Sequence, residues 1–270
     1  MTRRTPPRPL NVEELFPELT PFRTETVRLH PRAGRPTCRD SSVGGPLLWP
    51  VREPWPECPE HPGSPMVAVV QIFRADVPDT VPFPQGRDLL QVLWCPRRHA
   101  SQWVVPLVHW RSAEEVGEVR RTPRTPADAW YGQVPRPCVV HPETVTEYAS
   151  WDLPDELWDA LDARFEQVEE ETGWNYQYHL STAPGTKLGG YPGWSQEPRW
   201  PACQVCGAPM DHLLTVDSTE EHDNRQAWTP VEDRDVTWEG AGLSLGDLDG
   251  VRLFECRTCP GRPFAHHYGV

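Results

Sequence analysis

Runs of apolar residues with many β-branched side chains predict several short strands. Residues 66–73 form an almost continuous apolar run, whose length and valine content predict a strand buried on both faces. Residues 89–94 and 251–255 are also expected to be strands. Each of these two strands ends directly before a cysteine, Cys95 or Cys256.

Weaker patterns predict further strands. Residues 24–30 and 212–216 are strand candidates, and residues 103–110 contain Pro106, which favours an edge position. Residues 174–180 alternate aromatic or apolar with polar side chains, the period of a half-buried strand.

One long helix is predicted between Pro154 and Gly173. Proline suits a first helical turn, acidic residues follow it, and glycine commonly terminates a helix. Apolar residues three or four positions apart place one face toward a core. These residues are Leu157, Leu161, Phe165 and Val168. A shorter helix is expected to start at Asn11.

A segment of the chain occurs twice. The fifteen positions from Gly44 to Cys58 match Gly189 to Cys203 at a constant offset of 145, with six identities. The identities are two Gly, two Trp, one Pro and one Cys, and tryptophan is a rare residue to match twice. We interpret this match as an internal duplication.

The expected fold class is α+β, with mostly antiparallel strands. The duplication predicts two halves, residues 11–145 and 146–270, packed about a pseudo-twofold axis as a single unit. Residues 1–10 are basic and proline-rich and are expected to be disordered. Residues 217–250 carry ten acidic and two basic residues and are expected to be an exposed insertion.

Composition narrows the classes of function. The chain has 33 prolines among 270 residues, which favours short elements and much irregular structure. Its formal charge is 26 − 39 = −13, so nucleic-acid binding is not expected. No apolar run is long enough to span a membrane, and Met1 to Leu10 does not resemble a secretory signal. A cytoplasmic location is expected, where the eight cysteines stay reduced.

Two pairs of cysteines have the spacing of a metal site. Cys203 and Cys206 form one Cys-x-x-Cys pair, and Cys256 and Cys259 form another. Two such turns can complete a tetrahedron of thiolates around zinc. The alternative is four unrelated buried thiols.

The duplication predicts a second metal site in the first half. Cys58 and His61 align with Cys203 and Cys206, while Cys95 aligns with Cys256 and has His99 four residues later. Thiolate and imidazole are both usual zinc ligands. The alternative is that His61 and His99 are surface histidines. His109 or Cys138 could take the place of His99.

The two zinc ions are expected to be structural. Each set has four protein ligands, whereas a catalytic zinc normally keeps one position for water. No nucleophile elbow, phosphate loop or dinucleotide fingerprint occurs in the chain.

A groove between the two halves is a second candidate site. We expect it to be lined by Trp49 and Trp194, with Lys187 and Gln71 as polar candidates. The alternative is that both tryptophans are core residues. The Gly-Gly turns before them then supply only backbone angles that glycine tolerates.

Several short motifs recur in one known family. They are Ser42-Val43-Gly44-Gly45-Pro46, the Trp-Pro before the Cys-x-x ligand turn, Val70-Gln71-Ile72, Leu90-Gln91-Val92-Leu93, Lys187-Leu188-Gly189-Gly190-Tyr191-Pro192, and Leu245-Gly246-Asp247 before Leu253-Phe254. In combination they resemble the bacterial YwqG-like family, a domain of unknown function. The resemblance implies an α+β fold of two related halves and no established enzymatic activity.

The sequence therefore predicts a cytoplasmic, zinc-stabilised binding or interaction protein. Its ligand would be an unidentified protein or small molecule. The alternatives are an uncharacterised hydrolase or transferase, and an immunity-type protein whose acidic surface masks a basic toxin.

Overall fold

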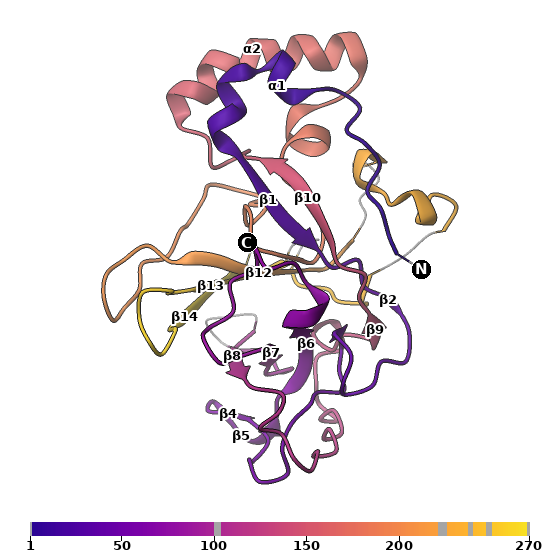
Figure 1. Cartoon of the computed structure of the whole chain (residues 1–270), viewed down its shortest axis with the longest axis vertical. Helices are drawn as coiled ribbons and strands as arrows, with labels where there is room; N and C mark the ends of the chain where they lie inside the picture. Colours follow the sequence, from indigo (N-terminus) through magenta and orange to yellow (C-terminus); the bar gives the residue numbers. More distant parts are fainter. Residues whose placement is uncertain (1, 100–103, 221–225, 237–239, 247–249, 269–270) are drawn as a thin grey trace.

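Two six-stranded antiparallel sheets form the body of the molecule in the computed structural model, and a helical unit lies beyond one end of it (Figure 1). The structure describes residues 2–99, 104–220, 226–236, 240–246 and 250–268. The mostly antiparallel sheets and few helices agree with the predicted class.

The first sheet has the strand order β2-β9-β3-β6-β7-β8. Its strands are β2 Arg32–Ala33, β9 Cys138–Val139, β3 Ser42–Val43, β6 Val67–Phe73, β7 Leu89–Trp94 and β8 Pro106–Arg111. Strand β8, which begins at Pro106, lies at the edge of the sheet, as predicted. A small separate hairpin pairs β4 Glu57–Cys58 with β5 His61–Pro65.

The second sheet has the order β10-β1-β11-β12-β13-β14. Its strands are β10 Glu143–Tyr148, β1 Arg23–Arg28, β11 Lys187–Leu188, β12 Asp211–Asp217, β13 Gly250–Glu255 and β14 Phe264–Tyr268. Every neighbouring pair is antiparallel.

The two sheets share chain segments. β1 comes from the N-terminal part of the chain but lies between β10 and β11 in the second sheet. The segments β1–β2 and β9–β10 pair with each other twice, as β1 with β10 and as β2 with β9. The predicted boundary after residue 145 falls inside β10. The two predicted halves are therefore interlocked through their sheets.

The central hairpins of the two sheets have the same construction. In one, Phe73 pairs with Leu89 and Val67 with Trp94, with a register shift between Ala68 and Val70. In the other, Asp217 pairs with Gly250 and Asp211 with Glu255, and the shift lies between His212 and Leu214. In both hairpins a cysteine, Cys95 or Cys256, follows directly after the second strand.

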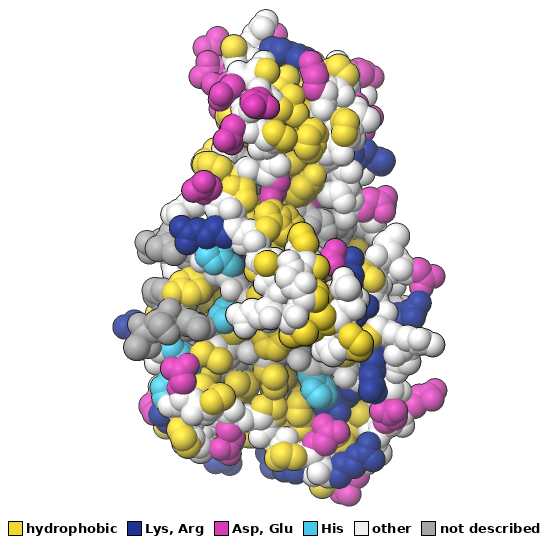
Figure 2. Space-filling view, turned by 90° about the vertical axis from the view of Figure 1, so that its left-hand side faces the viewer, with side chains coloured by type: hydrophobic (Ala, Val, Ile, Leu, Met, Phe, Trp, Pro, Cys, Tyr) yellow, Lys and Arg dark blue, Asp and Glu magenta, His cyan; other side chains and the backbone are white. Residues whose placement is uncertain are grey.

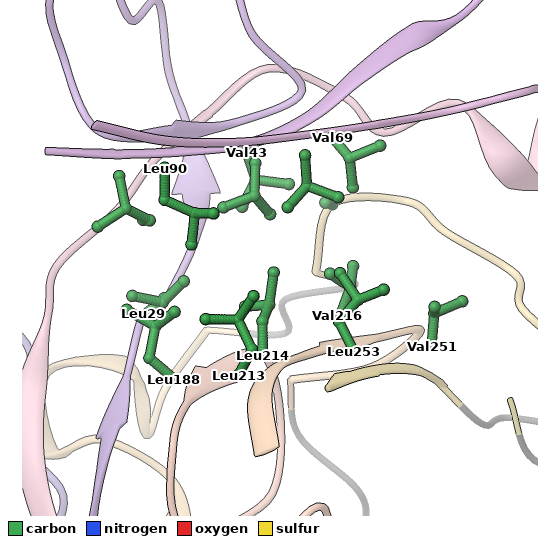
Figure 3. Packing of buried hydrophobic residues seen from close by; sticks show 14 of the residues in the cluster. Leu29, Val43, Val69, Leu90, Leu188, Leu213, Leu214, Val216, Val251 and Leu253 are labelled. Carbon is green, nitrogen blue, oxygen red and sulfur yellow. The ribbon is translucent and has the colours of Figure 1, made fainter. Parts of the chain in front are cut away.

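The main hydrophobic core lies between the sheets. Figure 3 shows Val43, Val69 and Leu90 of the first sheet facing Leu188, Leu214, Val216 and Leu253 of the second. Val67–Phe73 is buried along almost its whole length, which confirms the strand predicted from its continuous apolar pattern.

The helical unit has a core of its own. It contains α1 Val12–Leu15, a 3-10 helix Pro17–Phe22 and α2 Asp155–Thr172. Leu161 and Phe165 of α2 pack on Phe16, and Gly173 ends the helix in the left-handed conformation. The outer face of the unit is strongly acidic at the top of the molecule (Figure 2).

The strand predicted over residues 174–180 is wrong. Tyr176–Leu180 forms a single π-helical turn, capped by the side chain of Asn175, which accepts a hydrogen bond from the Tyr178 backbone N–H. Tyr176 and Leu180 are buried, whereas Tyr178 is 42% exposed. The ring of Tyr176 stacks on Phe165 at 4.2 Å, so packing against α2 overrides the alternating pattern.

Two segments expected to be exposed or disordered make defined contacts. Within 217–250, Ala241, Leu243 and Leu245 belong to the main core between the sheets. Near the N-terminus, the Arg4 backbone N–H donates to the Glu232 carboxylate, and the Arg4 carbonyl accepts from the Val231 N–H. The acidic segment therefore stabilises the N-terminal part of the chain, because its carboxylates bind the basic residues there.

The part of the chain that the structure describes contains no helix with the length and apolar character needed to cross a membrane.

Candidate metal centres and the neighbouring pocket

The four predicted cysteines of the second half lie together. Their sulfur atoms are all within 4.8 Å of one another. Cys203 Sγ is 3.9 Å from Cys259 Sγ, and Cys206 Sγ is 3.6 Å from Cys256 Sγ. A disulfide would bring two sulfurs to about 2.05 Å. Thiolates bound to one tetrahedral ion at about 2.3 Å are about 3.8 Å apart, which matches the observed spacing.

The backbone around Cys203 forms a tight knuckle. The Gly207 N–H donates to the Cys203 carbonyl at 2.8 Å, and the Cys203 N–H donates to the Ala208 carbonyl at 2.8 Å. Gly207 has a φ of +75°, which glycine adopts without strain. The Cys206 and Val205 N–H groups point at the Cys203 sulfur and lower the pKa of this thiol to about 7. The turn thus favours the thiolate that a metal binds.

The mixed group of the first half is assembled in the same way. Cys58, His61, Cys95 and His99 have their ligand atoms within 4.8 Å of one another. Cys58 Sγ is 3.3 Å from His99 Nε2, and Cys95 Sγ is 3.4 Å from His61 Nδ1. Sulfur and nitrogen ligands of one tetrahedral zinc would be about 3.5 Å apart.

Secondary structure brings the mixed group together. The β4–β5 hairpin pairs Cys58 with His61, and β7 delivers Cys95 from the first sheet. The Cys95 N–H donates to the Val105 carbonyl, which fixes the chain after the strand. Burial raises the pKa of the Cys95 thiol to about 11 when no cation is present. A bound metal would reverse this effect, because it stabilises the thiolate.

All eight predicted ligands therefore fall into two groups positioned to bind metal. The alternatives for His99 lie elsewhere. His109 packs against the Trp49 ring at 5.2 Å, and Cys138 is buried in the main core between the sheets. Each group is backed by a hydrophobic cluster that contains its buried cysteines.

The four residues predicted to line one groove do not meet at a single site, although Lys187 and Trp194 both border one small pocket. Trp49 (3% exposed) packs behind the mixed metal group, and Trp194 (7% exposed) packs behind the four-cysteine group. Gln71 is buried and accepts a hydrogen bond from the Leu48 N–H. Lys187 is buried and pairs with Glu147 at 2.7 Å. The structure thus agrees with the core interpretation of both tryptophans.

The Gly-Gly turns are explained by backbone angle and close packing. All four glycines have φ between +64° and +78°. A Cβ on Gly190 would overlap the Glu147 carboxylate, which accepts from the Tyr191 N–H and from Lys187. A side chain at this position would therefore displace the buried ion pair.

A pocket lies beside the second Gly-Gly turn. Its volume is about 360 Å³, within the range of small-ligand sites. Its walls come from β1, the start of β12, the Gly-Gly turn, and the loop after β6. The lining includes Thr24, Thr26, Thr80, Gly189, Tyr191 and Trp200. None of the four residues predicted for the groove lines this pocket, whose walls come from segments distant in the sequence.

No protein-family model matches the chain, and no curated protein matches it. Its function therefore has to be inferred from the geometry of these sites.

Proposed function

We propose that the protein is a binding protein whose fold is stabilised by two structural zinc ions. The observation that carries the metal proposal is the pair of four-ligand groups, each completed by side chains of this chain alone. Thiolate and imidazole ligands at tetrahedral spacing suit zinc better than magnesium or calcium, which prefer oxygen ligands.

The proposed zinc ions are structural because each has a full set of protein ligands. A catalytic zinc needs an open position for water or substrate. Both groups also lie against hydrophobic clusters and join the end of one strand to a knuckle or hairpin. The metal-binding energy would then contribute directly to folding.

Metal analysis of purified, reduced protein tests this proposal. We expect about two zinc ions per chain, as each complete tetrahedral set holds one. Cys256→Ser and Cys95→Ser should each lose one ion and unfold at a lower temperature. Cys138→Ser is the matched control, since Cys138 is buried but lies outside both groups. It should keep both ions. Fewer than one zinc in the wild-type chain would contradict the proposal.

We also propose that the fold arose by duplication. The strands β1-β2-β3-β6-β7-β8 and β9-β10-β11-β12-β13-β14 occupy matching positions in the two sheet orders, with β1 and β9 exchanged between the sheets. The shared register, shared bulge position and paired glycine turns support this. The repeat boundary would then precede β9. The likeness of this chain to the YwqG-like family is a resemblance in short sequence motifs.

The pocket beside Gly189 and Gly190 is the proposed binding site. It combines half-exposed Trp200, Tyr191 and aliphatic walls with threonine hydroxyls, the composition of many ligand sites. Filling it with Thr80→Trp should abolish binding of the ligand without lowering stability, because Thr80 is exposed on a loop. Thermal-shift screening of wild type against this variant would detect such a ligand.

A second candidate function is the masking of a basic partner. The exposed face of α2 carries eight acidic side chains and is visible at the top of Figure 2. Its members are Asp155, Glu156, Asp159, Asp162, Glu166, Glu169, Glu170 and Glu171. A basic partner bound there should dissociate as salt rises. Unchanged affinity between low and high salt would exclude this mode.

A further inference from the structure

The second sheet has a gap in its third strand. β11 contains only Lys187–Leu188, whereas its neighbours β1 and β12 contain six and seven residues. β11 pairs only with Val27 and Arg28 on one side and with Leu214 and Thr215 on the other. The Gly189 N–H still donates to the Leu213 carbonyl at 3.1 Å. Beyond this contact, residues 23–25 of β1 and 211–212 of β12 have no strand residue between them in the part of the chain that the structure describes.

The chain leaves the sheet at the second Gly-Gly turn, where the Thr26 hydroxyl donates to the Leu188 and Gly189 carbonyls. Gly189 and Gly190 have φ of +64° and +66°, outside the range of a strand. Glu147 holds the departing chain, because its carboxylate accepts from the Tyr191 N–H. The pocket begins at this point and is lined by Thr24, Glu25 and Thr26 on one side and by Asp211, His212 and Leu213 on the other.

The backbone of β1 points into this gap. The Leu29 N–H donates to the Thr186 carbonyl on the β11 side, and the Ala149 N–H donates to the Phe22 carbonyl on the β10 side. Successive residues of an antiparallel strand point their N–H and C=O groups to alternate sides. Odd-numbered residues of β1 therefore face β11, and the N–H and C=O of Glu25 face the gap.

The corresponding place in the first sheet is closed. A Cβ on Gly44 would lie 2.6 Å from the Arg136 carbonyl oxygen and 2.9 Å from that of Pro135. In contrast, a Cβ on Gly189 would have nothing within 4 Å. The chain before β9 thus packs onto the first Gly-Gly turn, whereas the second turn borders open space.

We propose that this pocket binds an extended peptide segment, which continues β11 between β1 and β12. This inference rests on the proposed function of the pocket as the binding site. Two strands that flank a common neighbour are about 9.6 Å apart, which leaves the width of one strand. A peptide of about three residues would match residues 23–25 of β1 and could form backbone hydrogen bonds there.

The pocket walls define the preferred side chains. Val27, Val81, Leu188 and Leu213 are aliphatic, and Tyr191 and Trp200 are aromatic. Its lining contains three charged residues, Glu25, Asp211 and Arg257, of which Asp211 and Arg257 pair with each other at 3.5 Å. The peptide should therefore be uncharged and apolar, with its specificity coming from side chains and its orientation from backbone hydrogen bonds.

A pool of N-acetylated, C-amidated tetrapeptides of uncharged residues provides the probe. The full chain is equilibrated with the pool, bound peptides are identified by mass spectrometry, and hydrogen exchange is measured with one retained peptide. Residues 23–28 and 211–217 should then exchange at least about tenfold more slowly, the change expected when a few hydrogen bonds close. The Glu25 amide should show this protection.

Variants of the pocket distinguish its occupant. Thr24→Trp on β1 and Thr80→Trp on the loop after β6, which both line the pocket, should weaken peptide binding by at least about tenfold. Thr144→Trp, on the exposed face of β10, should leave it unchanged. Protection at the edge strands β8, β10 or β14 would overturn the inference.

A screen of non-peptide ligands distinguishes the peptide inference from the broader proposal that the pocket is the binding site. Binding of sugars, nucleosides or small carboxylic acids that Thr80→Trp abolishes, without binding of any tetrapeptide, would overturn the peptide inference and leave the pocket function intact. If neither peptides nor these small molecules bind, both proposals fail.

Discussion

At Gly190, close packing requires the same residue that the repeated sequence motif contains. Gly190 stands in the repeated Gly-Gly pair and faces the buried Glu147–Lys187 ion pair. Such a pair stabilises a fold only when its remaining hydrogen-bonding atoms are satisfied. Glu147 meets this condition by accepting from the Ala183 and Tyr191 N–H groups as well as from Lys187.

Substitution of the two adjacent glycines tests this packing. Gly189 and Gly190 have nearly the same φ, so an alanine at either position meets similar backbone strain, about 1 kcal/mol. Only at Gly190 would the new Cβ meet the Glu147 carboxylate and lie 2.7 Å from Thr26 Cβ. Gly190→Ala should therefore lower the free energy of unfolding in urea well beyond Gly189→Ala. Equal losses would contradict this account.

Glu220 gives a pH-dependent prediction. Its carboxylate is fully buried and accepts from the Thr186 N–H, and burial raises its pKa from 4.5 to about 7. Between these two values the folded state binds more protons than the unfolded state, so the stability contributed by this group falls as pH rises.

Glu220→Gln should remove that contribution. The stability of the variant relative to wild type should therefore increase from pH 5 to pH 8, as measured by urea unfolding at each pH. Glu232→Gln is the control, since hydrogen bonds from Arg4 lower the pKa of Glu232 and this carboxylate should be ionised throughout that range. A constant difference between Glu220→Gln and wild type across this range would show that Glu220 is ionised in both states.

Among the elements, the strands that end at ligands were the most predictable. β7 and β13 have apolar patterns that stop at Cys95 and Cys256. The segment 174–180 shows the limit of such reasoning. Its alternation fits a strand, but Tyr176 and Leu180 are four residues apart and are buried together in a helical turn. A short pattern can satisfy both periods, and contact with α2 decides between them.

The β4–β5 hairpin gives an element-scale prediction. A two-stranded hairpin is marginally stable by itself, and this one carries two ligands of the mixed group. Removal of metal with a chelator should therefore speed hydrogen exchange in residues 57–65. The central strands β6 and β7 should stay protected, since they are buried within the first sheet. Exchange in 57–65 that is independent of metal would argue against the mixed site.

For the whole molecule, the interlocked strands are the decisive feature. β1 belongs to the second sheet, and β9, which follows the long loop after β8, belongs to the first. A cut in that loop therefore removes an internal strand from each sheet. Each fragment alone should therefore expose the edges of the strands that flank the missing one.

Two fragments test this interlocking. Residues 1–124 and 125–270, cut in the exposed part of the loop, should each fail to show cooperative thermal unfolding. When co-expressed, they should form a one-to-one complex that retains the metal content of the intact chain, as measured by size-exclusion chromatography and elemental analysis. Independent folding of either fragment would mean that the shared strands are dispensable.

Local signals in the sequence predicted the ligand chemistry of this protein. The spacing of Cys203 and Cys206, of Cys256 and Cys259, and their repeated counterparts predicted both ligand groups, because two ligands a few residues apart are held by one turn. The long helix and the apolar strands were also predictable, since their signals are local periodicities.

The contacts between distant segments, in contrast, could be known only from the folded chain. The exchange of β1 and β9 and the gap beside Gly189 depend on contacts between residues more than a hundred positions apart. The burial of Trp49 and Trp194 in separate clusters depends on contacts between residues tens of positions apart. A periodic pattern states that one face is buried but not which partner covers it. That choice is made by the packing of the whole chain, where shape and hydrogen bonding of many segments are satisfied at once.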